Sequence, residues 1–213
     1  MERIKESALL ATAAALVALE LAVAFLQRLA LVRGFSPLTW IAAVRCADII
    51  LFFTLFRILS VPFSTAGLRR FVRGSLMGMG VSLVLGSGFF LLLYVVQVLW
   101  GVDLRAFVNP GLKVRGVVPL AVLCLLGPFV EEIFFRGLCY TLIRVHCGVW
   151  LSVVLSALIF AASHLLGAGT VAVVLVPLMG GVIFALLYEY TDSLFAPFVL
   201  HGVGNFILFS RII

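Results

Sequence analysis

Charged residues are scarce in this sequence. Of its 213 residues, 11% are Asp, Glu, Lys or Arg and 64% are hydrophobic, and the mean hydropathy is +1.29. A soluble globular domain usually has about 25% charged and about 45–50% apolar residues. A fold of this size could not hide so much apolar surface from water, so lipid must solvate much of it. The composition therefore excludes an ordinary soluble protein and predicts an integral membrane protein.

The short motifs of metal and redox centres are also missing. The sequence contains no HExxH, and its four cysteines show no CxxC spacing. These cysteines lie in or near hydrophobic segments, where the residue behaves as a small apolar side chain. The net charge of +6 does not indicate nucleic acid, because many Lys and Arg residues lie between hydrophobic runs, where they orient helices and meet anionic lipid headgroups.

Long hydrophobic runs dominate the chain instead. A membrane-spanning helix needs about 20 apolar residues, and seven segments meet this length: about 7–27, 38–59, 75–100, 116–145, 148–166, 169–190 and 193–212. The first is long enough to span and lacks a distinct cleavage signature, so we interpret it as a transmembrane helix and not as a signal peptide. We expect an all-α, polytopic membrane helix bundle of about seven transmembrane helices, or eight if the long fourth segment is divided.

The fourth segment contains two prolines, Pro119 and Pro128, at which a helix of about 30 residues could bend. Asn109-Pro110-Gly111 precedes it and is a turn signal. With the N-terminus in the cytoplasm, about seven Lys and Arg residues lie inside and about six outside. The positive-inside rule therefore favours this orientation only slightly.

Ionisable residues at membrane depth are costly and are functional by default. In the first half of the chain they are Glu20, Arg45 and Asp48. Arg45 and Asp48 are three residues apart and can pair on one helix face, whereas Glu20 has no cation nearby in the sequence. The favoured interpretation of all three is a polar contact that locks the bundle, and substrate gating is the alternative.

The stretch GPFVEEIFFRG at 127–137 carries more information. Glu132 and Arg136 are four residues apart in the favourable order for a helical ion pair. Glu131 points about 100° away from Glu132 and has no local partner, so it is free to face an internal cavity. Desolvation there would suit a carboxylate to general acid–base work. Pro128 lacks an N–H and could open the turn to water. The alternative is a charge cluster at the membrane boundary.

Two later segments carry histidines at helical spacing. Phe160 and His164, in FAASHLL, share one helix face, and so do His201 and Asn205 in HGVGNF. Gly202 and Gly204 allow another helix or a substrate backbone to approach closely. His201 and Asn205 can both donate hydrogen bonds, as an oxyanion site requires. Each pair, taken alone, also fits a hydrogen-bonded contact inside the bundle.

The chain resembles the CPBP family, which comprises the CAAX proteases and the bacteriocin-processing (Abi) proteins. The resemblance rests on three motifs in the family's order: EEIFFR at 131–136, FAASH at 160–164 and HGVGN at 201–205. The resemblance covers about 116–212 and implies an intramembrane endopeptidase. By this resemblance, Glu131 and His164 activate a water, His201 and Asn205 stabilise the oxyanion, and Glu132, Arg136 and Phe160 support the site. We expect one continuous membrane domain with a catalytic core at 116–213 and N-terminal helices of unassigned role at 1–115.

Zinc is the alternative to a metal-free glutamate mechanism. Glu131, His164 and His201 could form a three-ligand site with water in the fourth position, but no HExxH motif supports it, and Asn205 has a natural role only beside an oxyanion. We therefore expect no metal and no other cofactor.

Two other functions fit the same polar residues. In a proton-coupled transporter, Glu131, His164 and His201 would form a relay, but inverted repeats and paired broken helices are not evident. A non-catalytic scaffold of the bacteriocin-immunity kind is the other. For the protease we expect a membrane-associated peptide or protein substrate, prenylated or not, a lipid bilayer as surroundings, no nucleic acid, and a location in a bacterial inner membrane.

Overall fold

The structure, a computed structural model, describes residues 2–28, 36–102, 114–168 and 174–210. These residues form helices and the loops between them, with no strand among them. The predicted turn at Asn109-Pro110-Gly111 lies outside the described residues. The helices are α1 (Glu2–Arg28), α2 (Pro37–Ile58), η1 (Phe63–Ala66), α3 (Phe71–Trp100), α5 (Val117–Ala121), η2 (Val122–Leu126), α6 (Gly127–Glu132), η3 (Ile133–Tyr140), α7 (Thr141–His146), α8 (Val149–Ala168), α9 (Leu175–Thr191) and α10 (Phe195–Phe209).

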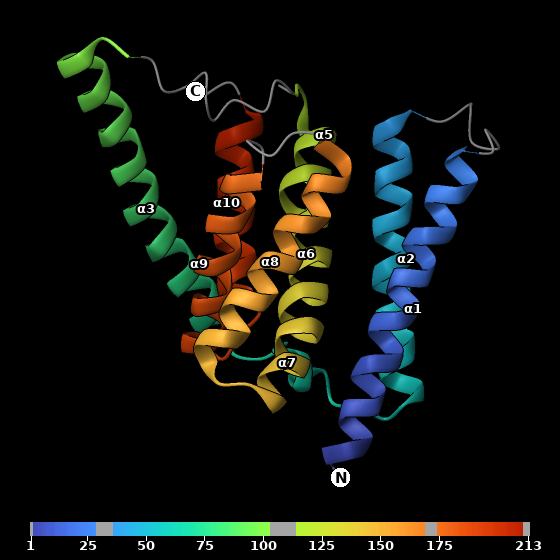
Figure 1. Ribbon diagram of the computed structural model, residues 1–213. Coiled ribbons are helices and arrows are strands. Elements are labelled where there is room, and N and C mark those ends of the chain that lie inside the picture. Colours follow the sequence, from blue (N-terminus) through green and yellow to red (C-terminus); the bar gives the residue numbers. More distant parts are fainter. Residues whose placement is uncertain (1, 29–35, 103–113, 169–173, 211–213) are drawn as a thin grey trace.

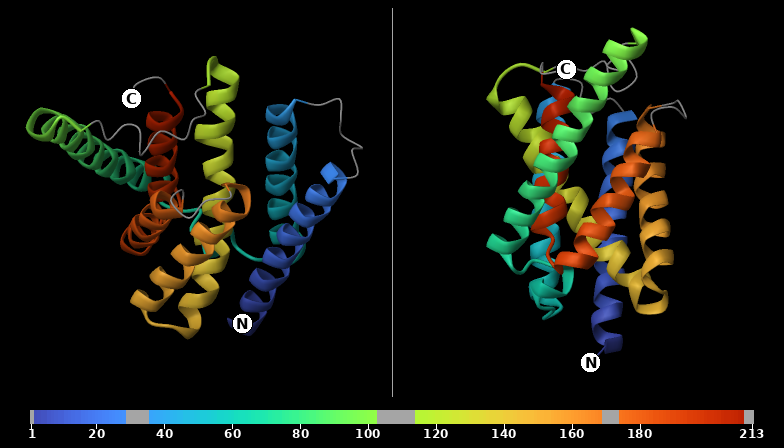
Figure 2. Two further views of the ribbon diagram at one scale, coloured as in Figure 1. Left: turned by 45° about the horizontal axis from the view of Figure 1, so that its top comes forward. Right: turned by 90° about the vertical axis from the view of Figure 1, so that its left-hand side faces the viewer.

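Each of the seven predicted segments corresponds to a helix or a run of helices, so the predicted all-α bundle is confirmed. Figures 1 and 2 show α1 and α2 as a pair on one side and α3 on the opposite side. Between them stand the run from α5 to α7 and the helices α8, α9 and α10. The C-terminal helices are therefore flanked by N-terminal helices on two sides.

Among the residues that the structure describes, three helical stretches are long and apolar enough to cross a membrane: Glu6–Phe25, Phe63–Trp100 and Val117–His146. Three shorter apolar helices accompany them, at Val149–His164, Leu175–Thr191 and Phe195–Phe209. The apolar side chains of α3 point outward along much of its length, and Val84, for example, is 72% exposed. Lipid contact explains such a surface, and the chain is an integral membrane protein.

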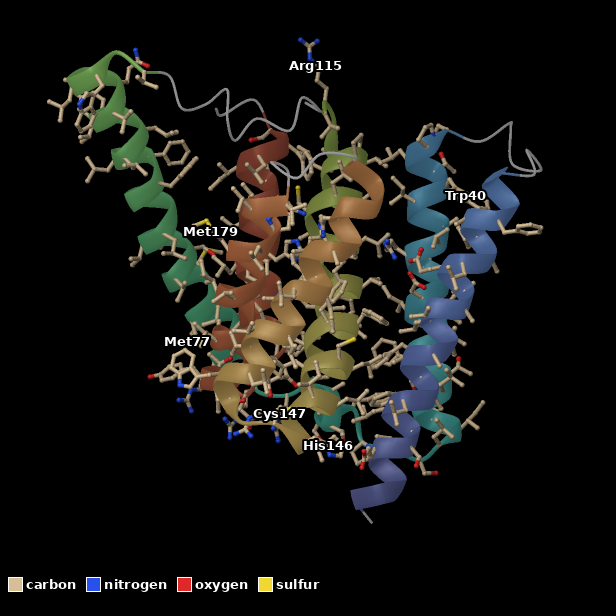
Figure 3. All side chains as sticks on the ribbon, viewed as in Figure 1. Trp40, Met77, Arg115, His146, Cys147 and Met179 are labelled. Carbon is tan, nitrogen blue, oxygen red and sulfur yellow. The ribbon has the colours of Figure 1, made fainter. Side chains whose placement is uncertain are left out.

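The run from Val117 to His146 crosses the whole bundle. Arg115, just before it, and His146, at its end, lie at opposite ends of the molecule (Figure 3). At 1.5 Å per residue its 30 residues measure about 45 Å, which exceeds the roughly 30 Å hydrocarbon core. The run does not divide into two spans. It contains two π-helical stretches, η2 and η3, and such widened turns often occur at functional sites.

Small residues set the closest contacts between helices. Gly78 of α3 packs against the backbone of Ala196 on α10, where a Cβ would come within 2.4 Å of the Ala196 carbonyl oxygen. Gly181 of α9 lies against Ala157 of α8, with 3.0 Å between its notional Cβ and the Ala157 Cα. Helices in lipid associate through such close packing, because lipid tails are as apolar as the side chains. These contacts set α10 against α3 and α9 against α8.

Candidate active site

Glu132 and Arg136 form a buried ion pair at the centre of the bundle. Both side chains are fully buried, and Arg136 Nη1 donates to Glu132 Oε1 at 3.0 Å. The pair that the four-residue spacing predicts is therefore present. Arg136 Nη2 also donates to the Gly181 carbonyl of α9 at 3.1 Å, and its guanidinium lies 4.7 Å from the centre of the Phe160 ring of α8. Arg136 thus joins η3 to two other helices.

Glu132 has a second partner that the sequence did not indicate. The same Oε1 atom lies 2.9 Å from His201 Nδ1 on α10, and His201 is buried. Because Glu132 is paired with Arg136, we assign it as an ionised acceptor, so Nδ1 of His201 carries the proton. Glu132 therefore contacts His201 as well as pairing with Arg136, and both contacts are of the kind expected of a supporting residue.

Glu131 occupies a different environment from its neighbour. Its Oε2 atom is 3.6 Å from His201 Nε2, and this oxygen is buried without a hydrogen-bond partner among the described residues. The side chain as a whole is 25% exposed and lines a cavity. A buried oxygen without a hydrogen bond is costly and calls for an explanation, and a catalytic role is one. The sequence predicts Glu131 as the acid without a partner on its own helix, and the structure places it beside His201 of α10 and on the cavity wall.

His164 lines the same cavity as Glu131. Its Nδ1 atom lies 2.9 Å from the Phe160 carbonyl oxygen one turn earlier, which fixes Nδ1 as the donor. The Phe160 ring contacts both histidines, with centroid distances of 4.6 Å to His164 and 5.7 Å to His201. Within the described part of the chain, no hydrogen bond joins His164 to Glu131. The two side chains share a cavity without direct contact.

Asn205 donates a hydrogen bond to the backbone of the central run, at a carbonyl group that Pro128 leaves without a backbone donor. The Gly127 N–H at the end of η2 bonds to the Val122 carbonyl, five residues back. The corresponding donor for the Leu123 carbonyl would be residue 128, and proline has no N–H. Asn205 Nδ2 fills this role and donates to the Leu123 oxygen at 2.9 Å. The amide retains a second N–H, because an Asn side chain carries two donors.

Gly202 allows α10 to approach the same turn. A Cβ at this position would come within 2.5 Å of the Cys124 carbonyl oxygen. The predicted close approach at this glycine is therefore present, whereas nothing lies within 4 Å of a Cβ at Gly204. Since His201 directly precedes Gly202, the contact between α10 and η2 helps to set the position of the imidazole.

The cavity beside Glu131 has a volume of about 700 Å³, which lies in the range of small-molecule and cofactor sites. Its walls are not confined to the C-terminal helices. Helix α1 supplies Glu20, and α2 supplies Arg45 and Asp48, opposite the Glu131 and His164 walls. Arg45 Nη1 donates to Asp48 Oδ2 at 2.9 Å, as the three-residue spacing predicts, and also pairs with Glu20.

The structure therefore brings Glu131, Glu132 and His201 together, places His164 across a shared cavity, and ties Asn205 to the neighbouring turn. Within the described residues, no three His, Cys, Asp or Glu side chains are grouped closely enough to hold a metal ion. The sequence reasoning did not foresee that the Glu20–Arg45–Asp48 cluster faces this cavity. The feature of the sequence that could have indicated this cluster is the presence of three ionisable residues, Glu20, Arg45 and Asp48, at membrane depth.

Residues 113–207 match the family model described as Rce1-like, type II CAAX prenyl endopeptidase. The match spans all three motifs and confirms the resemblance to the CPBP family inferred from them. Helices α1, α2 and α3 lie outside the matched residues. A search of curated proteins found no match, and a search of solved structures found none.

Proposed function

We propose that the protein is an intramembrane endopeptidase that hydrolyses a peptide bond near a membrane-embedded or lipid-modified C-terminal segment. The observation that carries the proposal is Glu131, whose buried oxygen has no hydrogen-bond partner among the described residues yet whose side chain lines a cavity inside a hydrophobic bundle. The match to a CAAX prenyl endopeptidase model supports the reaction class and a prenylated peptide as substrate. The compact chain and its basic loops favour a bacterial inner membrane.

In the proposed reaction, Glu131 and His164 activate a water in the cavity. Glu131 accepts a proton as the water oxygen attacks the scissile carbonyl carbon, and His164 holds the water through its free Nε2. The proton then passes to the leaving amine as the C–N bond breaks, so one water is consumed for each peptide bond cut. General acid–base groups of this kind contribute typically 10²–10⁴-fold to a rate.

His201 and Asn205 stabilise the oxyanion in this scheme. Glu132 accepts from Nδ1 of His201, and in this scheme His201 donates to the oxyanion from Nε2, the ring atom on the Glu131 side. Asn205 offers the N–H that the Leu123 carbonyl does not use. Donors held in place by a buried ion pair and by a backbone carbonyl need little reorganisation as charge develops, which is the condition for a large electrostatic effect.

The test is cleavage of an internally quenched, farnesylated CAAX peptide by the purified protein in detergent, with the products identified by mass spectrometry. We expect one endoproteolytic cut that yields a short C-terminal fragment and a farnesylated remainder. Intact peptide after prolonged incubation with folded, monodisperse protein would contradict this substrate class. Proton or solute flux through protein in liposomes, without cleavage of the peptide, would favour the transporter.

We also propose that the reaction needs no metal. The grouping of potential ligands in the described residues offers no three-ligand set, and the roles above use only the chain's own side chains. Overnight dialysis against EDTA and 1,10-phenanthroline should leave the rate within about twofold of the untreated protein. A loss of activity that added Zn²⁺ restores would contradict the metal-free scheme while leaving the protease intact.

A further inference from the structure

Arg45 lines the cavity, although it lies outside the residues that match the family model. It lies on α2, whereas the match covers residues 113–207, and it shares the cavity lining with Glu131 and His164. Its Nη1 atom carries both of its ion pairs, to Asp48 and to Glu20. The proposed reaction gives this residue no role.

The other edge of the Arg45 guanidinium is available. Nε and Nη2 make no hydrogen bond to any described residue, and neither is among the buried polar atoms without a partner. The side chain is 25% exposed. An arginine presents five N–H donors in a rigid fork. Two carboxylates on Nη1 hold that fork in one orientation, so three donors remain for a ligand in the cavity.

We propose that Arg45 binds a main-chain carbonyl oxygen of the peptide substrate and holds the segment across the cavity from Glu131. This inference rests on the proposed endopeptidase function. A peptide drawn into a membrane cavity must find partners for its carbonyl groups, since each one left unbonded in an apolar medium costs several kcal/mol. Arg45 is a fixed donor in the cavity that the reacting carboxylate also lines.

The negative charge of the cavity lining favours a neutral carbonyl group over a carboxylate as the ligand of Arg45. The cavity lining already holds three carboxylates, those of Glu20, Asp48 and Glu131, against the single arginine Arg45. Like charges a few ångströms apart repel strongly inside a protein, where the effective dielectric constant is far below that of water. A carboxylate at Arg45 would meet such repulsion from both of its present partners. A carbonyl oxygen accepts the same hydrogen bonds without that cost.

A second account gives Arg45 only a structural role, as the tie between α1 and α2. Two variants separate the accounts. Arg45→Gln removes the donor edge, and combining it with Asp48→Asn avoids a buried carboxylate without its cation. Glu20→Gln takes the charge out of the tie to α1 but keeps Arg45, its partner Asp48 and the open edge. Thermal unfolding in detergent establishes that each variant is folded.

The experiment measures binding in the Glu131→Gln background, so that cleavage does not interfere. Two fluorescent farnesylated CAAX peptides serve as probes, one with a free C-terminal carboxylate and one with a C-terminal amide, and anisotropy gives Kd. We expect Arg45→Gln/Asp48→Asn to raise Kd at least about tenfold for both peptides, the effect of losing a hydrogen bond from a charged donor. Glu20→Gln weakens one of the two contacts that hold the fork but keeps its open donors, so it should raise Kd clearly less than the Arg45 variant does.

Several results would overturn the inference. The first is an unchanged Kd in the Arg45 variant. The second is a rise in Kd in Glu20→Gln equal to that in the Arg45 variant. The third is that neither peptide binds to the Glu131→Gln protein that carries no further substitution. A rise confined to the carboxylate peptide would identify a carboxylate as the ligand and contradict the choice of a carbonyl. In the catalytically intact protein, Arg45→Gln should raise KM and leave kcat within about threefold. Cleavage that survives Glu131→Gln would instead count against the proposed function, so the two failures are distinguishable.

Discussion

Glu131 and Glu132 are neighbours in the sequence, but they have different partners in the fold. Glu132 is fully buried and its Oε1 atom contacts both Arg136 and His201. Each carboxylate has one oxygen without a hydrogen bond among the described residues, but Glu131 is 25% exposed and lines the cavity. The difference follows from the roughly 100° rotation between adjacent helical positions. One carboxylate organises the site, and the other is available to react.

Replacement of Glu132 tests its organising role. Glu132→Gln leaves the Arg136 guanidinium buried without its counter-ion, and breaking a buried pair in this way costs about 3–5 kcal/mol. We expect a large fall in Tm in detergent, together with loss of cleavage. Glu6→Gln is the matched control, because Glu6 pairs with the exposed His146 and an exposed pair contributes little. A Tm for Glu132→Gln equal to that of Glu6→Gln would contradict the assignment.

At the scale of the helices, the central run and α10 depend on each other. Pro128 leaves the Leu123 carbonyl without its backbone donor, and Asn205 supplies one. One turn earlier on α10, Gly202 allows close approach to the Cys124 carbonyl. The π-helical stretch η2 is therefore the surface against which α10, and with it His201, is positioned.

Gly202→Ala tests this contact. Ala favours a helix over Gly by roughly 0.5–1 kcal/mol, so a loss cannot come from helix propensity. The new Cβ would lie 2.5 Å from a backbone oxygen that cannot rotate away, so α10 must shift and displace His201. We expect cleavage to fall at least about tenfold. Gly204→Ala, with nothing within 4 Å, should stay within about twofold, and equal rates for the two variants would contradict the account.

Contacts within one helix were predictable from the sequence. The Glu132–Arg136 pair, the Arg45–Asp48 pair and the shared face of Phe160 and His164 all follow from spacings of three or four residues. Contacts between helices were not. Periodicity gives the face on which a side chain lies, but packing decides which helix that face meets. The pairing of Glu20 with Arg45, of His201 with Glu132 and of Asn205 with Leu123 therefore required the structure.

At the scale of the whole molecule, the cavity joins the two halves of the chain. The family match supplies the Glu131 and His164 walls, and α1 and α2 close the opposite side with a charged cluster. Hydrolysis requires this cavity to hold water within a bundle whose outer surface is apolar. The helices outside the match thus complete the compartment in which the proposed chemistry takes place.

Water access can be measured by cysteine labelling in a variant whose four native cysteines are replaced. Ser163 lines the cavity, so Ser163→Cys should react with a small, membrane-impermeant thiol reagent in liposomes. Leu158, on the same helix, is 49% exposed and is not among the residues lining the cavity, so Leu158→Cys should face lipid and react far more slowly. Equal labelling rates would contradict a water-filled cavity.

Whether Glu131 performs the chemistry is tested most directly by the cleavage rate of Glu131→Gln on the farnesylated CAAX peptide. Gln has nearly the same shape but cannot accept the proton from water. We predict a loss of at least about 10²-fold in kcat, with a Tm within a few degrees of the unaltered protein. Cleavage at the unaltered rate by a folded Glu131→Gln protein would contradict the account.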